Sequence, residues 1–138
     1  MTFSTPVVVR SYELDTRGHL NQAVYVQYAE HARWELMRAA GVGHDKLLAS
    51  GVGPVVLETT IKYRHELRSG DEVRITCEFD WQQGKTFRIR QEIRKLDGTV
   101  AAEVSAIGGV IDLAARKLVE APGERFRTLA ERPGLLGL

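Results

Sequence analysis

The chain has 138 residues, a hydrophobic fraction of 43%, a charged fraction of 27% and a formal net charge of +1. This length fits one domain with a sizeable core, so we expect residues 1–138 to form a single domain. The balanced charge argues against nucleic acid or a membrane surface as a partner, and no apolar run is long enough to span a membrane. The N-terminus lacks a secretion signal, and one cysteine, Cys77, cannot form an internal disulfide, so we expect a cytoplasmic protein.

The N-terminal third predicts a strand, a turn and a long helix. β-branched residues indicate a strand over 7–14, and Gly18 gives the following turn its backbone freedom. Over 22–40 the apolar residues recur at helical spacing, on a stripe formed by Tyr25, Tyr28, Ala29, Ala32 and Leu36. Asn21 is the expected N-cap, and Gly41 is the expected stop signal.

The rest of the chain predicts antiparallel strands. Alternating apolar and polar residues indicate strands, and Gly, Pro and Asp-Gly signals indicate the turns between them. The expected strands cover residues 54–67, 71–81, 85–96, 99–112 and 117–120, with one or two helical turns in 44–50 and a terminal helix over 123–132. Small residues in the strand over 99–112 suggest that another element packs closely against it. A strand, a helix and then a run of strands predict an α+β layer arrangement, in which a subunit partner covers a long edge strand.

Asp15 is expected at the end of a strand, beside the start of the long helix. The helix start at Asn21, Gln22 and Ala23 offers unpaired N–H groups and the positive end of the helix dipole. An ester or thioester carbonyl placed there would meet a base or nucleophile on one side and oxyanion donors on the other. The simpler alternative is that Asp15 only caps its own turn and that Asn21 only caps the helix.

The histidines give weaker signals. His19 is either structural or acts as a general acid or pocket wall beside Asp15. His31 and Glu35 can share a helix face, but no third ligand accompanies them, so we expect no metal site.

Three motifs carry a resemblance to a known family. They are V-R-x-x-E-x-D-x-x-G-H-x-N-x-A-x-Y-x-x-Y-x-E-x-A-R-W over residues 9–34, I-x-Y-R-x-x-L-x-x-G-D-x-V over 61–73 and W-x-x-G-K-T-F over 81–87. With them the chain resembles the hotdog-fold acyl thioesterases, in the 4-hydroxybenzoyl-CoA thioesterase-like branch. The resemblance implies an antiparallel sheet wrapped around one long helix. It also implies dimers or tetramers whose active sites lie at the dimer interface.

The resemblance assigns roles to individual residues. It places the catalytic carboxylate on Asp15 and the oxyanion donor on the backbone N–H of Gln22, with Gly18 and His19 adjacent to the site. Lys85 matches a basic residue of the hairpin that contacts coenzyme A phosphates in the family.

Two further groups remain open between a functional and a structural explanation. Arg88 alternates with other arginines on one strand face, which is either a solvated charged face or part of a phosphate patch. The strand that carries Glu58, Thr59 and Thr60 passes near the active site in the resembling proteins. One explanation is that one face of this strand lines the acyl pocket of a partner. The other is ordinary strand alternation, in which Glu58 and Thr60 face outward and have no functional role.

The expected function is hydrolysis of an acyl-CoA thioester to the free acid and CoA, without a metal or cofactor. Asp15 would either attack the carbonyl and form an anhydride or activate a water molecule. The alternatives are an acyl-carrier-protein thioesterase and a non-catalytic acyl-CoA-binding hotdog module. A hydratase or dehydratase ranks last, because the sequence offers no paired Asp and His to move protons across a C–C bond.

Overall fold

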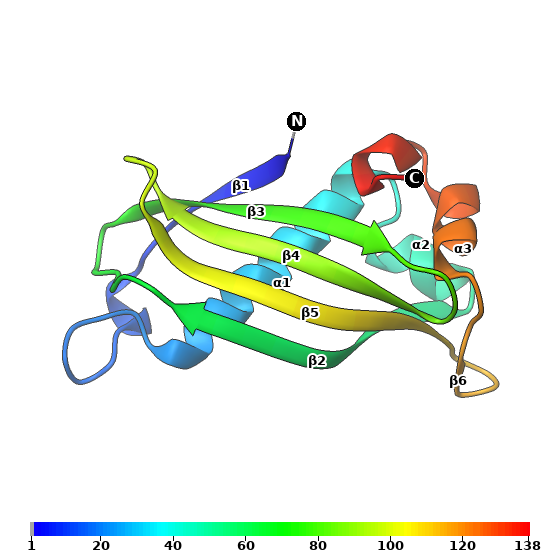
Figure 1. The fold of residues 1–138 in the computed structure, drawn as a ribbon, viewed down its shortest axis with the longest axis horizontal. Coiled ribbons are helices and arrows are strands. Elements are labelled where there is room, and N and C mark those ends of the chain that lie inside the picture. The colour runs from blue at the N-terminus through cyan, green and yellow to red at the C-terminus, as the bar shows by residue number, and fades with distance from the viewer. Residues whose placement is uncertain (1) are drawn as a thin grey trace.

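A computed structural model describes residues 2–138, in which an antiparallel sheet curls around the long helix α1 (Figure 1). The strands are β1 (Phe3–Val8), β2 (Val52–Tyr63), β3 (Glu72–Trp81), β4 (Thr86–Lys95), β5 (Val100–Asp112) and β6 (Lys117–Leu118). The helices are α1 (Gln22–Ala39), α2 (His44–Ala49) and α3 (Pro122–Leu129), with short 3-10 turns at Ser11–Glu13 and Pro133–Leu136. The strand order is β1-β3-β4-β5-β2, and β6 pairs with β5. None of the helices within 2–138 is long and apolar enough to cross a membrane.

Helix α1 occupies the predicted range and begins and ends for the predicted reasons. The Asn21 side chain accepts the Ala23 N–H at 2.9 Å, and so caps the helix start. At the other end Gly41 adopts a φ of +82° and lies against Glu131, whose side chain would be 2.7 Å from a Cβ at this position. The helix therefore has a fixed start, which matters because the candidate site lies there.

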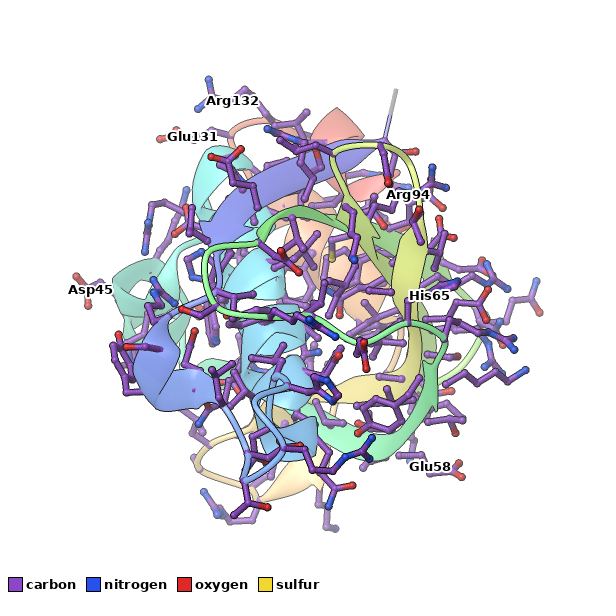
Figure 2. All side chains as sticks on the ribbon, turned by 90° about the vertical axis from the view of Figure 1, so that its left-hand side faces the viewer. Asp45, Glu58, His65, Arg94, Glu131 and Arg132 are labelled. Carbon is purple, nitrogen blue, oxygen red and sulfur yellow. The ribbon has the colours of Figure 1, made fainter. Side chains whose placement is uncertain are left out.

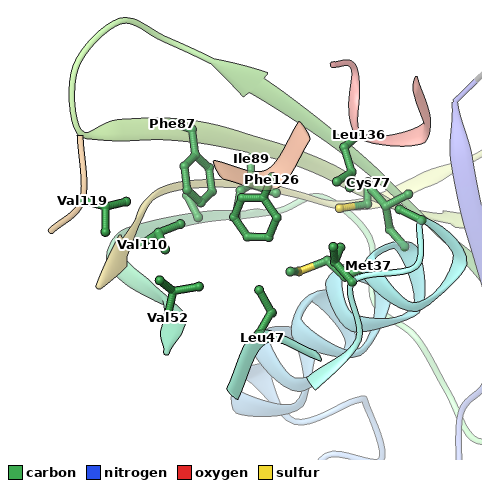
Figure 3. Packing of buried hydrophobic residues seen from close by; sticks show 14 residues of the cluster. Met37, Leu47, Val52, Cys77, Phe87, Ile89, Val110, Val119, Phe126 and Leu136 are labelled. Atoms are coloured by element: carbon green, nitrogen blue, oxygen red, sulfur yellow. The ribbon is translucent and has the colours of Figure 1, made fainter. Parts of the chain in front are cut away.

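Strand β5 presents small side chains to the helix. Ala102, Val104 and Ala106 are buried. Ala102 belongs to the same hydrophobic cluster as Ala32 of the helix, and Ala106 to the same cluster as Leu36. The close packing that the small residues of β5 predict is therefore confirmed. Figure 3 shows the part of this core that lies toward α2 and α3, with Met37, Phe87 and Phe126 around it.

Gln91 of β4 is a polar residue inside this core, with 2% of its surface exposed. Its Nε2 donates to the Ala29 carbonyl of α1 at 2.8 Å, and its Oε1 accepts from Arg33 at 3.2 Å. Both ends of the amide are therefore satisfied, as a buried polar group requires. The pair of bonds fixes where along β4 the helix lies.

Two predicted strands differ from the structure by four residues or more, and the strand expected over 117–120 covers only Lys117–Leu118. The first was expected over 7–14 but covers Phe3–Val8, because Val9 bonds to Asp71 and the chain then turns, with Glu13 N–H donating to the Arg10 carbonyl. The strand expected over 54–67 covers Val52–Tyr63. It ends early because the next two N–H groups of the chain both turn to the carbonyl of Ala101. The 3-10 turn at Pro133–Leu136 was not predicted.

Strand β2 lies at an edge of the sheet and pairs with β5 along one side. Within residues 2–138 no strand pairs with its other side. The strand carries a bulge between Val56 and Glu58, and Val56, Leu57 and Tyr63 are each about half exposed. A long, partly apolar edge strand of this kind is a ready template for pairing with another chain.

Candidate active site

The turn that carries Asp15 is closed by its own backbone and side chain. Leu14 and Leu20 form a bridge, and the Asp15 N–H donates to the His19 carbonyl at 2.7 Å. Oδ1 of Asp15 accepts the N–H groups of Arg17 at 2.8 Å and of His19 at 3.2 Å. Within residues 2–138, Oδ2 accepts no hydrogen bond. One carboxylate oxygen thus fixes the turn, as the simpler interpretation requires, while the other is available for chemistry.

The helix start next to this turn has one unused donor among its first N–H groups. Asn21 N–H donates to the Glu13 carbonyl at 2.9 Å, and Ala23 N–H donates to the Asn21 side chain. Among the described residues the Gln22 N–H has no acceptor, although it lies at the positive end of an 18-residue helix. Of the three residues predicted as oxyanion donors, Gln22 is therefore the one with a backbone N–H to offer.

Two tyrosines that the sequence analysis did not assign to the site lie beside the helix start. Tyr63, at the end of β2, donates its hydroxyl to the Gln22 carbonyl at 3.2 Å. Its ring meets Tyr25 edge to face, with ring centroids 5.0 Å apart. Burial raises the pKa of Tyr25, and the neighbouring Tyr63 and the charge of Asp15 add to this shift. The I-x-Y-R motif includes Tyr63, but nothing in its spacing indicates this contact.

His19 and Gly18 support the turn in different ways. The His19 ring is largely buried, and its Nε2 lies 3.0 Å from the Glu66 carboxylate, so it ties the turn to the loop between β2 and β3. Gly18 adopts a φ of +79° and donates its N–H to the Asp15 carbonyl at 3.1 Å. A Cβ there would meet nothing within 4 Å, so glycine is needed for its backbone conformation and not for space.

The surroundings of Asp15 keep it ionised. The backbone N–H groups of His19 and Arg17 lower the pKa of Asp15 below its ordinary value of 3.8, because both donate to the charged form. A carboxylate of this kind is present as the anion at neutral pH. It can therefore act directly as a nucleophile or as a base.

The residues predicted on β2 lie on different faces of the strand. In the register with β5, Thr59 pairs with Ala106 and faces the helix, whereas Glu58 and Thr60 pair with Ile107 and Ser105 and face away. Figure 2 shows Glu58 at the outside of the molecule. Within one protomer only Thr59 of the three faces the side on which α1 lies.

The structure does not bring Lys85 or Arg88 to Asp15 within one protomer. Lys85 is exposed in the β3–β4 turn, one residue before Thr86, which is level with Val55 of β2. The helix start that follows the Asp15 turn contacts Tyr63, at the other end of the same strand. Eight residues of β-strand separate these two levels by about 26 Å. Figure 1 shows the Asp15 turn (blue) and the β3–β4 hairpin at opposite ends of the sheet.

The outer face of the sheet holds Arg88. Its Nη1 donates to Ser105 at 3.1 Å, on the face away from α1. Its neighbours there include Arg90, which pairs with Asp80, and Arg94, which pairs with Glu92. These ion pairs involve two of the basic residues on the charged face that the sequence predicted. No group of three or more His, Cys, Asp or Glu side chains within 2–138 is arranged to hold a metal ion.

Known proteins share this sequence and fold. The long-chain acyl-CoA thioesterase FadM of Escherichia coli is 30% identical over 121 residues, which cover 87% of this chain and 91% of that protein. An acyl-acyl carrier protein thioesterase from the chloroplast of Arabidopsis thaliana is 42% identical over 64 residues. That match spans only 34% of the plant protein.

The fold comparison agrees with the sequence comparison. The crystal structure of YbaW, a probable thioesterase from Escherichia coli, superposes with a TM-score of 0.82 at 29% identity and covers 91% of this chain and 95% of that one. The predicted hotdog fold and the predicted family resemblance are thereby confirmed. The sequence pattern of the thioesterase-like superfamily matches residues 9–130, and the chain belongs to this superfamily.

Proposed function

We propose that the protein hydrolyses acyl-CoA thioesters, with Asp15 as the reacting carboxylate and the Gln22 N–H as the oxyanion donor. The observation that carries the proposal is a fixed carboxylate, with Oδ2 available, in the turn directly before a helix whose first N–H is unused. The names of the relatives, which are thioesterases acting on acyl-CoA or acyl-acyl carrier protein, support the same reaction class.

Two routes use this arrangement. In the first, Oδ2 of Asp15 attacks the thioester carbonyl, the C–S bond breaks to release the CoA thiolate, and water then hydrolyses the mixed anhydride. In the second, Asp15 removes a proton from water while that water attacks the carbonyl, and the C–S bond breaks in the same way. Both routes develop negative charge on the carbonyl oxygen, which the Gln22 N–H would stabilise. ¹⁸O found in Asp15 after a single turnover in H₂¹⁸O would identify the first route, because water that attacks the Asp15 carboxyl carbon of the anhydride leaves its oxygen there, whereas the second route puts ¹⁸O only in the released acid.

The decisive variant is Asp15→Asn, which keeps a side-chain oxygen for the turn but removes the anion. We expect at least a hundredfold loss in the rate of CoA release, the usual scale for losing a general base or nucleophile. Asp112→Asn is a matched control, because Oδ1 of Asp112 also accepts two backbone N–H groups, those of Ala114 and Ala115 at 2.9 Å. Equal activity of the two variants would remove Asp15 from the mechanism.

A homodimer formed through the free edge of β2 would complete the site. Antiparallel pairing of two β2 strands about their middle brings the Tyr63 end of one strand next to the Val55 end of the other. Lys85 of the partner subunit would then lie on the same side as Asp15, where it can bind the phosphates of the bound CoA. The half-exposed apolar residues of this edge favour such pairing.

The dimer has its own test. Leu57→Lys places a charge in the bulge of the edge strand, so we expect a monomer in sedimentation velocity and a loss of thioesterase activity. Leu48→Lys is the control, because Leu48 is equally exposed, at 52%, but lies on α2. A wild-type protein that sediments as a monomer at micromolar concentration and is active would contradict the interface model.

A second acyl carrier is favoured by one observation. The 42% identity over 64 residues is to a plant protein that acts on acyl-acyl carrier protein. Release of free thiol should therefore be measured with octanoyl esters of both CoA and holo-acyl carrier protein. A preference for the carrier-protein ester would mean that the substrate is acyl-acyl carrier protein, hydrolysed by the same mechanism. Tight acyl-CoA binding without turnover would favour the non-catalytic binding module.

A further inference from the structure

A polar hollow of about 680 Å³ lies on the outer face of the sheet, on the side away from α1. Strands β1 to β5 all contribute to its lining, and none of the described residues that line it is aromatic. Five cations and three carboxylates surround it, so the hollow has an excess of positive charge. The proposed hydrolysis uses none of these residues, so that reaction does not explain the charge.

Arg88 on β4 is the least exposed of the four arginines that line the hollow, yet it has no carboxylate partner. Among the described residues no carboxylate lies within 4.0 Å of its guanidinium, whereas Arg90 and Arg94 are exposed and each lies within 3.1 Å of one. Nη1 of Arg88 donates to the Ser105 hydroxyl, and its other N–H donors have no partner within 2–138. A half-buried charge is normally paired, because its removal from water costs free energy. An unpaired Arg88 is therefore typical of an anion-binding side chain.

Further donors surround the contact between Arg88 and Ser105. Thr60 of β2 lies directly opposite Ser105 in the sheet register, so the two hydroxyls are neighbours on the outer face. Lys62 follows on the same face, about 7 Å along the strand, and its ammonium group forms no ion pair within 2–138. One guanidinium, one ammonium group and two hydroxyls thus lie over one part of the sheet. We call these four residues the outer-face patch.

The nearest carboxylates leave the outer-face patch positively charged. Glu103, opposite Lys62 in the sheet register, is already paired with Arg64 at 3.0 Å. Glu58 faces the same side but does not line the hollow, and it lies two strands from Arg88, a distance of about 10 Å. The charges of Arg88 and Lys62 are therefore available to a ligand.

We propose that the outer-face patch binds the phosphate group of a small phosphate monoester with a hydroxylated, sugar-like body. The Arg88 guanidinium binds two phosphate oxygens, and the Lys62 ammonium group and the two hydroxyls donate to the others. The hollow equals about twenty water volumes of roughly 30 Å³, which leaves room for the body of the ester. Hydroxyls and carboxylates in the lining suit a sugar, whereas a nucleobase would need an aromatic side chain to stack on.

The outer-face patch is separate from the proposed thioester chemistry. It lies on the face of the sheet opposite to α1, whereas the Gln22 N–H lies at the start of that helix. Pairing of β2 with a second copy would use the strand backbone, so the outward side chains of Thr60 and Lys62 would stay accessible in a dimer.

Calorimetric titration of the whole chain with ribose 5-phosphate tests the site, in a phosphate-free buffer with about 0.1 M salt. The wild type should bind this probe saturably, and ribose without the phosphate should not bind. Arg88→Gln and Lys62→Gln should each weaken binding about tenfold or more, the scale of one lost charge-assisted hydrogen bond. Thr60→Val keeps the shape of the side chain without its hydroxyl and should weaken binding about fivefold.

Arg74→Gln is the matched control. Arg74 also lines the hollow and forms no ion pair within 2–138, but it lies opposite Arg94, six residues or about 20 Å along β4 from Arg88. The variant removes the same charge at a distance that salt screens, so it should keep the wild-type affinity within about twofold. Urea unfolding of each variant checks that the fold is kept.

The outcomes are independent of thioester hydrolysis, because the titration needs no turnover. Equal weakening by Arg88→Gln and Arg74→Gln overturns the proposal, since it would show a general effect of charge. A wild type that gives no saturable heat with ribose 5-phosphate or with inorganic phosphate also overturns it. Inorganic phosphate that binds as tightly as the ester, and that Arg88→Gln weakens, supports the patch and assigns free phosphate as its ligand.

Discussion

Tyr28→Phe tests how the segment before Asp15 is held against α1. Tyr28 is a buried residue of the helix stripe, and its hydroxyl donates to Oε1 of Glu13 at 2.6 Å. The same carboxylate accepts the Arg10 N–H at 2.9 Å, and the Glu13 carbonyl accepts the Asn21 N–H. Glu13 thus links three points of the chain around the candidate site. The Phe variant removes one oxygen atom and keeps the ring.

The expected cost follows from the geometry of this bond. A hydrogen bond to a charged group contributes about 1.5–3 kcal/mol, and a short distance places this one among charge-assisted bonds. The Glu13 carboxylate keeps its Arg10 donors in the variant, so we expect a loss of about 2 kcal/mol in the free energy of unfolding. For a chain of 138 residues this corresponds to a fall of about 7 °C in Tm.

The loss should depend on pH in a defined direction. Burial opposes ionisation of Glu13, but the bonds from Tyr28 and Arg10 outweigh it and lower the pKa of Glu13 below its ordinary 4.5. A carboxyl whose folded pKa is lowered stabilises the fold above its unfolded pKa, and this contribution disappears as the pH falls through the folded pKa. The difference between wild type and Tyr28→Phe should therefore be full at neutral pH and should narrow below pH 4.5.

Urea unfolding of both proteins across this pH range measures the effect. Tyr12→Phe is the control, because Tyr12 lies in the same 3-10 turn but is 82% exposed, and it should unfold like the wild type. A double-mutant cycle with Glu13→Gln isolates the pair. If Tyr28→Phe differs from Tyr12→Phe by less than about 0.5 kcal/mol at neutral pH, the bond does not hold this segment as we argue.

Three more predictions follow from the site and the core. Because the pKa of Asp15 is lowered below 3.8, Asp15 stays ionised and kcat/KM should not fall between neutral pH and about pH 5. A decrease in kcat/KM that sets in above about pH 5 would contradict the assignment of Asp15 as the reacting carboxylate. Gly18→Ala should destabilise the fold by about 1 kcal/mol through its positive φ alone. Gly134→Ala, with an ordinary φ and equally open space, should not, and urea unfolding compares the two variants. Burial raises the pKa of the Cys77 thiol to about 12, so a thiol reagent at neutral pH should label it only after denaturant is added.

Local patterns in the sequence were sufficient for most of the elements. The apolar stripe, Asn21 and Gly41 determine α1 almost to the residue, because a helix is stabilised by contacts and caps within one stretch of chain. Alternation and the Asp-Gly turn likewise locate β3, β4 and β5 within one residue of their bounds. The motif around Asp15 adds the turn and the helix start, whose bonds are also local.

Contacts between distant segments were decided only by the tertiary structure. The strand order, the end of β2 at Tyr63, and the position of Gln91 under Ala29 each depend on a partner that the local pattern does not contain. The same holds at the site for Tyr63 of β2, whose hydroxyl donates to the Gln22 carbonyl from 41 residues along the chain. Propensity and periodicity describe one residue and its near neighbours, whereas a hydrogen bond or a cavity depends on which distant atoms the packed chain brings within a few ångströms.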